Sequence, residues 1–210
     1  PSSPTGAVVS PVDAPSSPAA SAPVSLPAPE PLPSGGAWIS TAAHGVKFGV
    51  PAGWQMFDLS TFTDPAVRAA LEPVAQKLGI TVDAYIQQLT MQNDLIATGP
   101  ERSGFSPTVS VRKEAALKSD YVPSKEEAQA QVAAAGGTVT EVQRLTTPLG
   151  VGYATLYTRV AADLGGRTIH CAQLGLPSAR NTMFLAVVES DQPAERDALV
   201  HLLTATLQPA

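Results

Sequence analysis

The chain has one cysteine and few aromatic residues, and these two shortages narrow what it can be. Cys171 is the only thiol among 210 residues, so no internal disulfide bond can form. A cysteine-rich zinc site is excluded for the same reason. The three histidines, at positions 44, 170 and 201, show none of the spacings that hold a metal ion. We therefore expect no metal and no cofactor.

Basic residues are too few for a nucleic-acid-binding protein. The chain has 13 Lys and Arg against 18 Asp and Glu, for a formal net charge of -5. Proteins that follow a phosphate backbone carry clustered basic residues instead. The densest basic spot is Arg112 with Lys113, and on a strand these two side chains point to opposite faces. We expect no nucleic-acid partner.

Long apolar runs are also missing, since none approaches the ~20 residues that a membrane-spanning helix needs. The first residue is Pro1 and the first methionine is Met56. We infer that an N-terminal targeting segment has been removed. These features predict a protein outside the cytoplasm, secreted or attached to the cell envelope, whose membrane association depends only on a removed N-terminal anchor.

Sequence motifs that carry catalysis are missing as well. The chain holds no G-x-S-x-G elbow, no P-loop and no G-x-G-x-x-G fingerprint. His170 and Cys171 are adjacent, but neighbours on a strand face opposite ways and cannot act as base and nucleophile. Cys171 is better explained as a small buried hydrophobe beside Ile169. The acidic stretch 189–197 is explained by carboxylates at the start of a helix. We expect the chain not to be an enzyme.

One catalytic alternative stays open. A serine-type hydrolase of the cell envelope could place a Ser or Thr nucleophile in the loop ERSGFSP, residues 101–107. Catalytic residues often sit on loops, and a triad can be drawn from distant parts of a chain.

What the sequence does have is a proline-rich beginning. Ten of its 20 prolines lie between Pro1 and Pro33, among Ser and Ala. Such a segment buries too little apolar surface to offset the entropy of ordering it. Residues 1–36 are therefore predicted to be a disordered tether, with an interdomain linker as the alternative. Residues 37–210 are predicted to form a single domain.

Patterns of strands and helices alternate along the rest of the chain. Strands are predicted at 38–40, 44–50, 54–57, 94–98, 108–113, 138–145, 150–161, 167–176 and 182–189, and helices at 64–79, 81–92, 124–135 and from 193 onward. The run 183–188 is apolar on both faces, which is typical of a central strand. The pattern predicts an α+β fold, a mainly antiparallel sheet with helices packed on it.

Residues 64–93 are predicted to form a helical hairpin. Asp64 and Pro65 begin its first helix, Gly79 ends it, and Pro73 should bend or split it. It carries one apolar stripe at spacings of three and four, which consists of Val67, Ala70, Leu71, Val74 and Leu78. The last helix of the chain is expected to face the core with Leu199, Leu202, Leu203 and Thr206.

Two further helix starts carry capping residues. Thr81 should begin the second helix of the hairpin, and Ser124 with Glu127 forms a capping box.

The stretch V-P-A-G-W at residues 50–54, between a Pro/Ala/Ser-rich leader and a meander of strands, resembles the secreted actinobacterial lipoproteins of the LpqN type. Their fold is PsbP-like. The resemblance implies a PsbP-like sandwich in which this corner is the first hairpin and Trp54 anchors it. It also implies envelope localisation, no catalytic residues, and binding of a lipid-like ligand or an envelope protein. The helical hairpin departs from the compact pattern of that family.

A ligand site is predicted where the helical hairpin meets the sheet. Apolar pockets with a few polar groups are the usual ligand sites. The candidate ligand-binding residues are Trp54, Met56, Phe57, Tyr85, Leu89, Tyr153 and Tyr157. Packing in the core is the alternative role for each. We expect a non-enzymatic, monomeric envelope module that binds an apolar or lipid-like ligand or an envelope protein.

Overall fold

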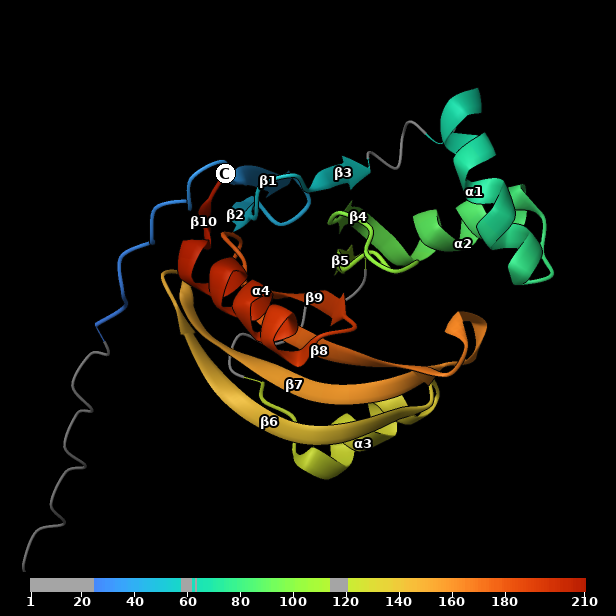
Figure 1. Ribbon diagram of the computed structural model, residues 1–210. Coiled ribbons are helices and arrows are strands. Elements are labelled where there is room, and N and C mark those ends of the chain that lie inside the picture. The colour runs from blue at the N-terminus through green and yellow to red at the C-terminus, as the bar shows by residue number, and fades with distance from the viewer. Residues whose placement is uncertain (1–24, 58–61, 63, 114–120) are drawn as a thin grey trace, which may run out of the picture.

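The computed structural model describes residues 25–57, 62, 64–113 and 121–210 (Figure 1). The helices are α1 (Pro65–Lys77), α2 (Val82–Gln92), α3 (Lys125–Ala133) and α4 (Pro193–Thr206), with a 3-10 turn, η2, at Ala162–Leu164. The strands are β1 (Ala37–Thr41), β2 (Val46–Val50), β3 (Gln55–Phe57), β4 (Asn93–Thr98), β5 (Thr108–Arg112), β6 (Gly137–Thr147), β7 (Gly150–Ala161), β8 (Arg167–Pro177), β9 (Met183–Ser190) and β10 (Gln208–Pro209).

Seven of the strands form one sheet in the order β3-β4-β5-β9-β8-β7-β6, and β1, β2 and β10 form a smaller sheet. The pairings between these strands are all antiparallel. β9 lies fourth of the seven strands and is buried along most of its length. The predictions of a mainly antiparallel α+β fold and of 183–188 as a central strand are confirmed.

The main core lies between the large sheet and a layer made of α4 and the small sheet (Figure 1). We call the face of the large sheet that meets this layer the inner face. Phe184, Ala186 and Val188 reach it from β9 at the two-residue period of a strand. α4 faces them with Leu199 and Leu203, both buried as predicted.

Thr206 ties α4 to the small sheet. It is fully buried, as predicted, and its Oγ1 accepts a hydrogen bond of 2.8 Å from the main-chain N–H of Gly49 in β2. Leu202, the remaining residue of the predicted stripe, is half-buried. The Thr206 hydroxyl therefore gives a partner to the buried N–H of Gly49, which would destabilise the fold if it had none.

α3 packs on the opposite, outer face of the large sheet, against β6 (Figure 1). The side chains that it buries against the strands are small, so the helix can lie close to them. Ala128 and Val132 are buried there in a second cluster with Tyr157, Ile169 and Cys171. The large sheet is thus covered on both faces, but by different helices at different places.

The helix start expected at Thr81 and the capping box expected at Ser124 are confirmed, and Thr81 also caps its helix. The Thr81 hydroxyl accepts a hydrogen bond of 3.2 Å from the N–H of Ala84. Ser124 and Glu127 form the reciprocal capping box, with bonds of 3.2 Å and 2.7 Å. Each start was readable from sequence because a cap is a local interaction.

The helices α1 and α2 stand beyond the β3 and β4 end of the sheet, away from the main core (Figure 1). The apolar stripe predicted for the first helix is therefore only partly covered. Leu71 is half-buried, but Val74 and Leu78 are 41% and 47% exposed. Pro73 lies within α1 and does not split it.

The Pro-Ala-Gly corner after β2 was expected to form the first hairpin, and that expectation is wrong. β2 pairs with β1 and β10, whereas β3 pairs with β4 in the other sheet. Gly53 has a φ of 78°, a left-handed conformation that glycine adopts without strain. The corner thus carries the chain from one sheet to the other, and the first hairpin is β1–β2.

The predicted tether falls partly within the described chain. Residues 1–24 lie outside the described residues. Residues 25–36 contain no helix or strand and lie along the domain, where the N–H of Glu30 donates a 2.8 Å hydrogen bond to the carbonyl of Ala205. Leu32 packs against Gly49 so closely that a Cβ on that glycine would meet its Cδ2 at 2.2 Å. This short stretch is seated on α4 and β2.

Candidate functional site

A crevice of about 380 Å³ lies between the α1–α2 pair and the outer face of β4 and β5. We call it the hairpin crevice. Its apolar lining consists of Phe57, Phe62, Leu71, Tyr85, Leu89 and Ile96. Its polar lining consists of Gln92, Asn93, Thr98, Thr108, Ser110, Arg112 and Glu189. A volume in this range, with apolar walls and a few polar groups, is typical of a small-molecule site.

The polar floor of the crevice follows from strand alternation. On β5, Val109 and Val111 are buried in the main core, so Thr108, Ser110 and Arg112 point to the outer face. The paired strand β4 repeats this pattern, with Leu95 and Ala97 inward and Ile96 and Thr98 in the crevice. The side chains of these strands that face inward build the core, and those that face outward form the floor of the crevice.

Two charged side chains mark the floor. Nη1 of Arg112 donates to the amide oxygens of Asn93 and Gln92 at 3.2 and 3.4 Å. Glu189 accepts two hydrogen bonds from the guanidinium of Arg159, at 3.1 and 3.2 Å. Burial lowers the pKa of Arg159, but the ion pair with Glu189 outweighs it and raises that pKa above its usual value. The charge of Glu189 is thus offset within the protein.

The structure brings three of the predicted ligand-binding residues together. Phe57, Tyr85 and Leu89 all line the hairpin crevice, contributed by β3 and α2. Met56 lines a neighbouring crevice of about 520 Å³ with Thr41, Asp94 and other residues, and is 55% exposed. Phe57 borders both spaces.

The other three predicted residues lie elsewhere. Trp54 is half-buried at the edge of the main core and packs over Gly99, where a Cβ would meet its ring at 2.8 Å. Tyr153 and Tyr157 are buried on the outer side of β7. Gly175, directly opposite Tyr153 on β8, leaves the space that its ring occupies. Tyr157 lies in the cluster under α3.

Cys171 is fully buried beside Ile169, in agreement with the packing role expected for it. Its Sγ is 3.8 Å from a carboxylate oxygen of Glu189. Burial, together with this negative charge, raises the pKa of the Cys171 thiol to about 12. Burial, together with the neighbouring Cys171 and Glu189, raises the pKa of Tyr157 above its usual value. A protonated, inaccessible thiol is a poor nucleophile.

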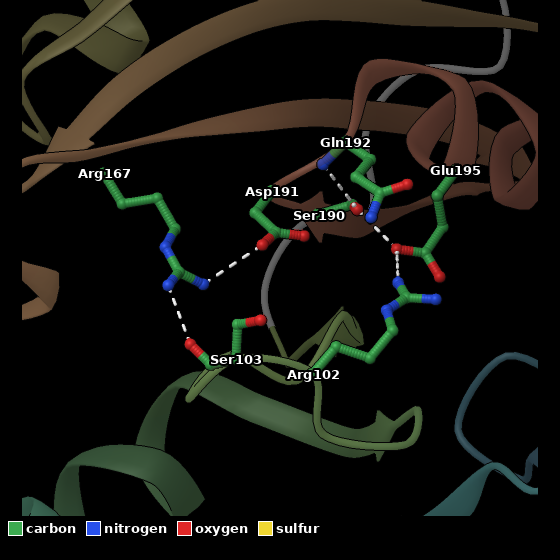
Figure 2. Close-up of polar contacts among 7 residues, drawn as sticks. All are labelled: Arg102, Ser103, Arg167, Ser190, Asp191, Gln192 and Glu195. Atoms are coloured by element: carbon green, nitrogen blue, oxygen red, sulfur yellow. Dashed lines mark hydrogen bonds and ion pairs between the residues drawn. The ribbon is translucent and has the colours of Figure 1, made fainter.

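The ERSGFSP loop is fastened to the start of α4 by a polar network (Figure 2). Arg102 forms an ion pair with Glu195, whose carboxylate also accepts a hydrogen bond of 2.6 Å from Ser190. Arg167 bridges the carbonyl oxygen of Ser103, at 2.7 Å, and the carboxylate of Asp191, at 3.1 Å (Figure 2). Hydrogen bonding to Glu195 raises the pKa of Arg102 above its ordinary value.

Two carboxylates of the acidic stretch 189–197, those of Asp191 and Glu195, belong to this network. Ser190 accepts a 3.0 Å hydrogen bond from the N–H of Gln192, which begins α4. Within the described chain, no histidine hydrogen-bonds to Ser103 or Ser106, the serines of the loop considered for a hydrolase. Ser103 adopts a φ of 50°, as a residue of a tight turn.

Across the described ranges, no group of three or more His, Cys, Asp or Glu side chains is arranged to hold a metal ion. None of the helices in these ranges is long and apolar enough to cross a membrane.

The sequence reasoning missed the polar floor. Its signal was present, because TVSVR at 108–112 alternates between apolar and polar residues. Arg112 and Lys113 do lie on opposite sides, as predicted, since one lines the hairpin crevice and the other lines the crevice beside Met56. What the alternation could not tell is which element covers the polar side.

Comparisons with known proteins extend only to the fold. No family model matches the sequence, and a search of curated proteins finds no match. The chain is similar in structure to the Saccharomyces cerevisiae Ran-binding protein Mog1p, with a TM-score of 0.49 and 10% identity over 83% of this chain and 95% of that one. It is also similar to CyanoP, the PsbP of Synechocystis sp. PCC 6803, with a TM-score of 0.47 and 11% identity over 85% and 94% of the two chains.

A mutant form of Mog1 is similar at a TM-score of 0.47 and 13% identity, over 83% of this chain and 95% of that one. A PsbP protein is thus among these similar structures. At such identities the likeness concerns the arrangement of the chain alone, and we take no ligand or partner from it.

Proposed function

We propose that the chain is a non-catalytic binding module of the cell envelope that holds an apolar or lipid-like ligand in the hairpin crevice. The crevice itself carries the proposal, because Phe57, Tyr85 and Leu89 converge there over a floor of hydroxyl groups. Residues of this kind favour an apolar chain, while the few polar groups orient it.

Two sequence features support the proposed location. The Pro/Ala/Ser-rich beginning suits a spacer that holds a domain away from a membrane or cell wall. The V-P-A-G-W corner resembles envelope lipoproteins of the LpqN type, for which binding of lipid-like ligands is implied. Both are arguments from sequence.

The ligand proposal is tested by native mass spectrometry of protein purified from its own host, followed by titration with lipids and glycolipids. We expect a mass shift that is lost on Leu89→Asp, which puts a charge on the apolar wall. A clean apo mass with no shift on titration would remove the ligand proposal. A matched Leu78→Asp variant, at an exposed position in the turn after α1, should keep the shift.

An envelope protein is the second candidate partner, and exposed apolar side chains favour it. Val74 on α1 and Met91 on α2 are 41% and 67% exposed, and Leu78, in the turn after α1, is 47% exposed. Val74 and Leu78 lie one helical turn apart, and neighbouring exposed apolar side chains are typical of a protein contact. Site-specific cross-linking from position 78 in host cells should trap one defined partner, and Val74→Asp should abolish the product while leaving lipid binding intact.

The hydrolase alternative is tested with a serine-directed covalent probe. We expect no labelling of Ser103 or Ser106. Labelling of either, lost in the matching Ser→Ala variant, would replace the binding proposal with a catalytic one.

A further inference from the structure

Arg112 stands apart from most arginines of the described chain because its charge meets no carboxylate there. Arg68, Arg102, Arg159, Arg167 and Arg196 each form an ion pair with an Asp or Glu. Arg112 meets only the neutral amide oxygens of Gln92 and Asn93, and both bonds use Nη1. Among the described residues, its Nε and Nη2 donors meet no acceptor, so they can bind a ligand.

The charge of Arg112 dominates the floor of the hairpin crevice. Glu189, the carboxylate in the lining, is bound by Arg159. Thr108 lies directly opposite Glu189 across the β5–β9 pair, and Arg112 lies four residues further along β5. At about 3.3 Å per residue, the backbone positions of Glu189 and Arg112 are roughly 13 Å apart along the strand direction. The floor therefore has a positive end and a neutralised end.

Apolar side chains line the space between these ends. Ile96 lies between Ser110 and Phe57 on the floor, and Leu89 faces them from α2. An anion alone gains nothing from these side chains, and a hydrocarbon alone gains nothing from Arg112. A ligand with both parts uses the whole crevice.

We propose that the hairpin crevice binds a single-chain amphiphile with a carboxylate headgroup, with the carboxylate on Arg112 and the chain along Phe57, Leu89 and Ile96. A guanidinium presents parallel N–H donors that match a carboxylate in a two-point hydrogen bond. This inference rests on the proposed function and specifies the chemical class of ligand for the same site.

The test compares dodecanoate, dodecan-1-ol and dodecylamine by isothermal titration calorimetry below their micelle concentrations, at neutral pH and low salt. Wild type should bind dodecanoate at least tenfold more tightly than the alcohol, and the amine most weakly. Arg112→Gln should bring the acid and the alcohol within about threefold of each other. Arg112→Lys, which keeps the charge but not the fork, should keep only part of the preference.

Two control variants separate the headgroup from the chain. Arg144→Gln changes an exposed arginine on β6 and should leave the preference unchanged. Leu89→Gln should weaken acid and alcohol by the same factor. Thermal unfolding of each variant checks that it is folded. If Arg112→Gln does not fold, Arg112→Lys takes its place in the test.

The failures are distinguishable. If wild type binds acid and alcohol equally, or if Arg112→Gln keeps the tenfold preference, the headgroup assignment is wrong while the binding function stands. If wild type binds none of the three amphiphiles, the ligand proposal and this inference fall together.

Discussion

Two helical parts of the molecule are built on similar sequence patterns and packed in opposite ways. α4 has 14 residues and buries six of them, whereas α2 has 11 residues and buries none. Yet α1 and α2 are the more strongly amphipathic helices. α4 is contacted by strands of both sheets, so apolar or small residues occupy more than one of its sides.

The difference shows that an apolar stripe predicts a helix but not its neighbours. A helix that lies over the middle of a sheet is covered by strands on both sides of its stripe. A helix pair beyond the sheet edge meets few of them, so part of its stripe is exposed and a crevice is left beneath. We infer that the core region stabilises the domain and that the α1–α2 pair forms its adjustable part.

The largest expected effect compares one leucine from each region. Leu203→Ala in α4 should lower the free energy of unfolding by about 3–5 kcal/mol, because it leaves a cavity in a fully buried site. Leu89→Ala in α2 should cost about 1 kcal/mol or less, since Leu89 is only half-buried. Urea unfolding measures both. Equal losses at the two positions would contradict the comparison.

Trp54 tests where the border between the regions lies. Trp54→Ala should cost about 2–3 kcal/mol, since the ring packs on the main core but is half-buried. Ligand binding in the hairpin crevice should not change. Unfolding followed by the fluorescence of Trp38, which is 41% exposed, provides the measurement, and an unchanged midpoint would assign Trp54 to a surface role.

The stability of the protein at alkaline pH tests a third region, the buried cluster under α3. The unfolded Cys171 thiol releases its proton near its ordinary pKa, whereas the folded thiol holds it until about pH 12. The folded state therefore binds more protons above about pH 9, and stability must fall as pH rises, by up to about 1.4 kcal/mol per pH unit for one proton.

Cys171→Ala should flatten that slope between about pH 9 and 10, before unfolded tyrosine begins to ionise. Guanidinium unfolding across this range gives the slope. A variant with the same slope as wild type would mean that the cluster under α3 is open to water.

The smallest expected effect lies at a cap. Thr81→Ala removes the side-chain bond to the N–H of Ala84 and should cost about 1 kcal/mol or less in global stability. Its effect should be local, as faster hydrogen exchange in α2 with α4 unchanged. A global loss above about 2 kcal/mol would show that the α1–α2 pair unfolds together with the core.

Much of the fold was predictable because its signals are local. The helix caps at Thr81 and Ser124 depend on residues three apart, and the apolar run in β9 shows a strand covered on both sides. The corner at residues 50–54 was misjudged because a turn sequence shows that the chain reverses, not which sheet the next strand joins. Trp54 packs between Gly99 and the core, and this contact between segments distant in sequence accompanies the pairing of β3 with β4.

The candidate site was predictable in part for the same reason. Phe57, Tyr85 and Leu89 were found because they flank the hairpin in sequence. Tyr153 and Tyr157 were grouped with them by residue type, and only the pairing of β7 with β8 shows that they are buried elsewhere. Arg112 was missed because it is singled out by forming no ion pair among the described residues, which only three-dimensional proximity reveals.

The seating of residues 25–36 on α4 and β2 has a mechanical consequence. This segment and the α1–α2 pair lie on opposite sides of the domain (Figure 1). Tension applied along the chain from its N-terminal side is first resisted by the bond from Glu30 to Ala205 and by the contact of Leu32 with Gly49. The load then passes into β1 and β2, which belong to the small sheet. The hairpin crevice lies outside this path, so a pull on the N-terminal segment should leave its shape unchanged.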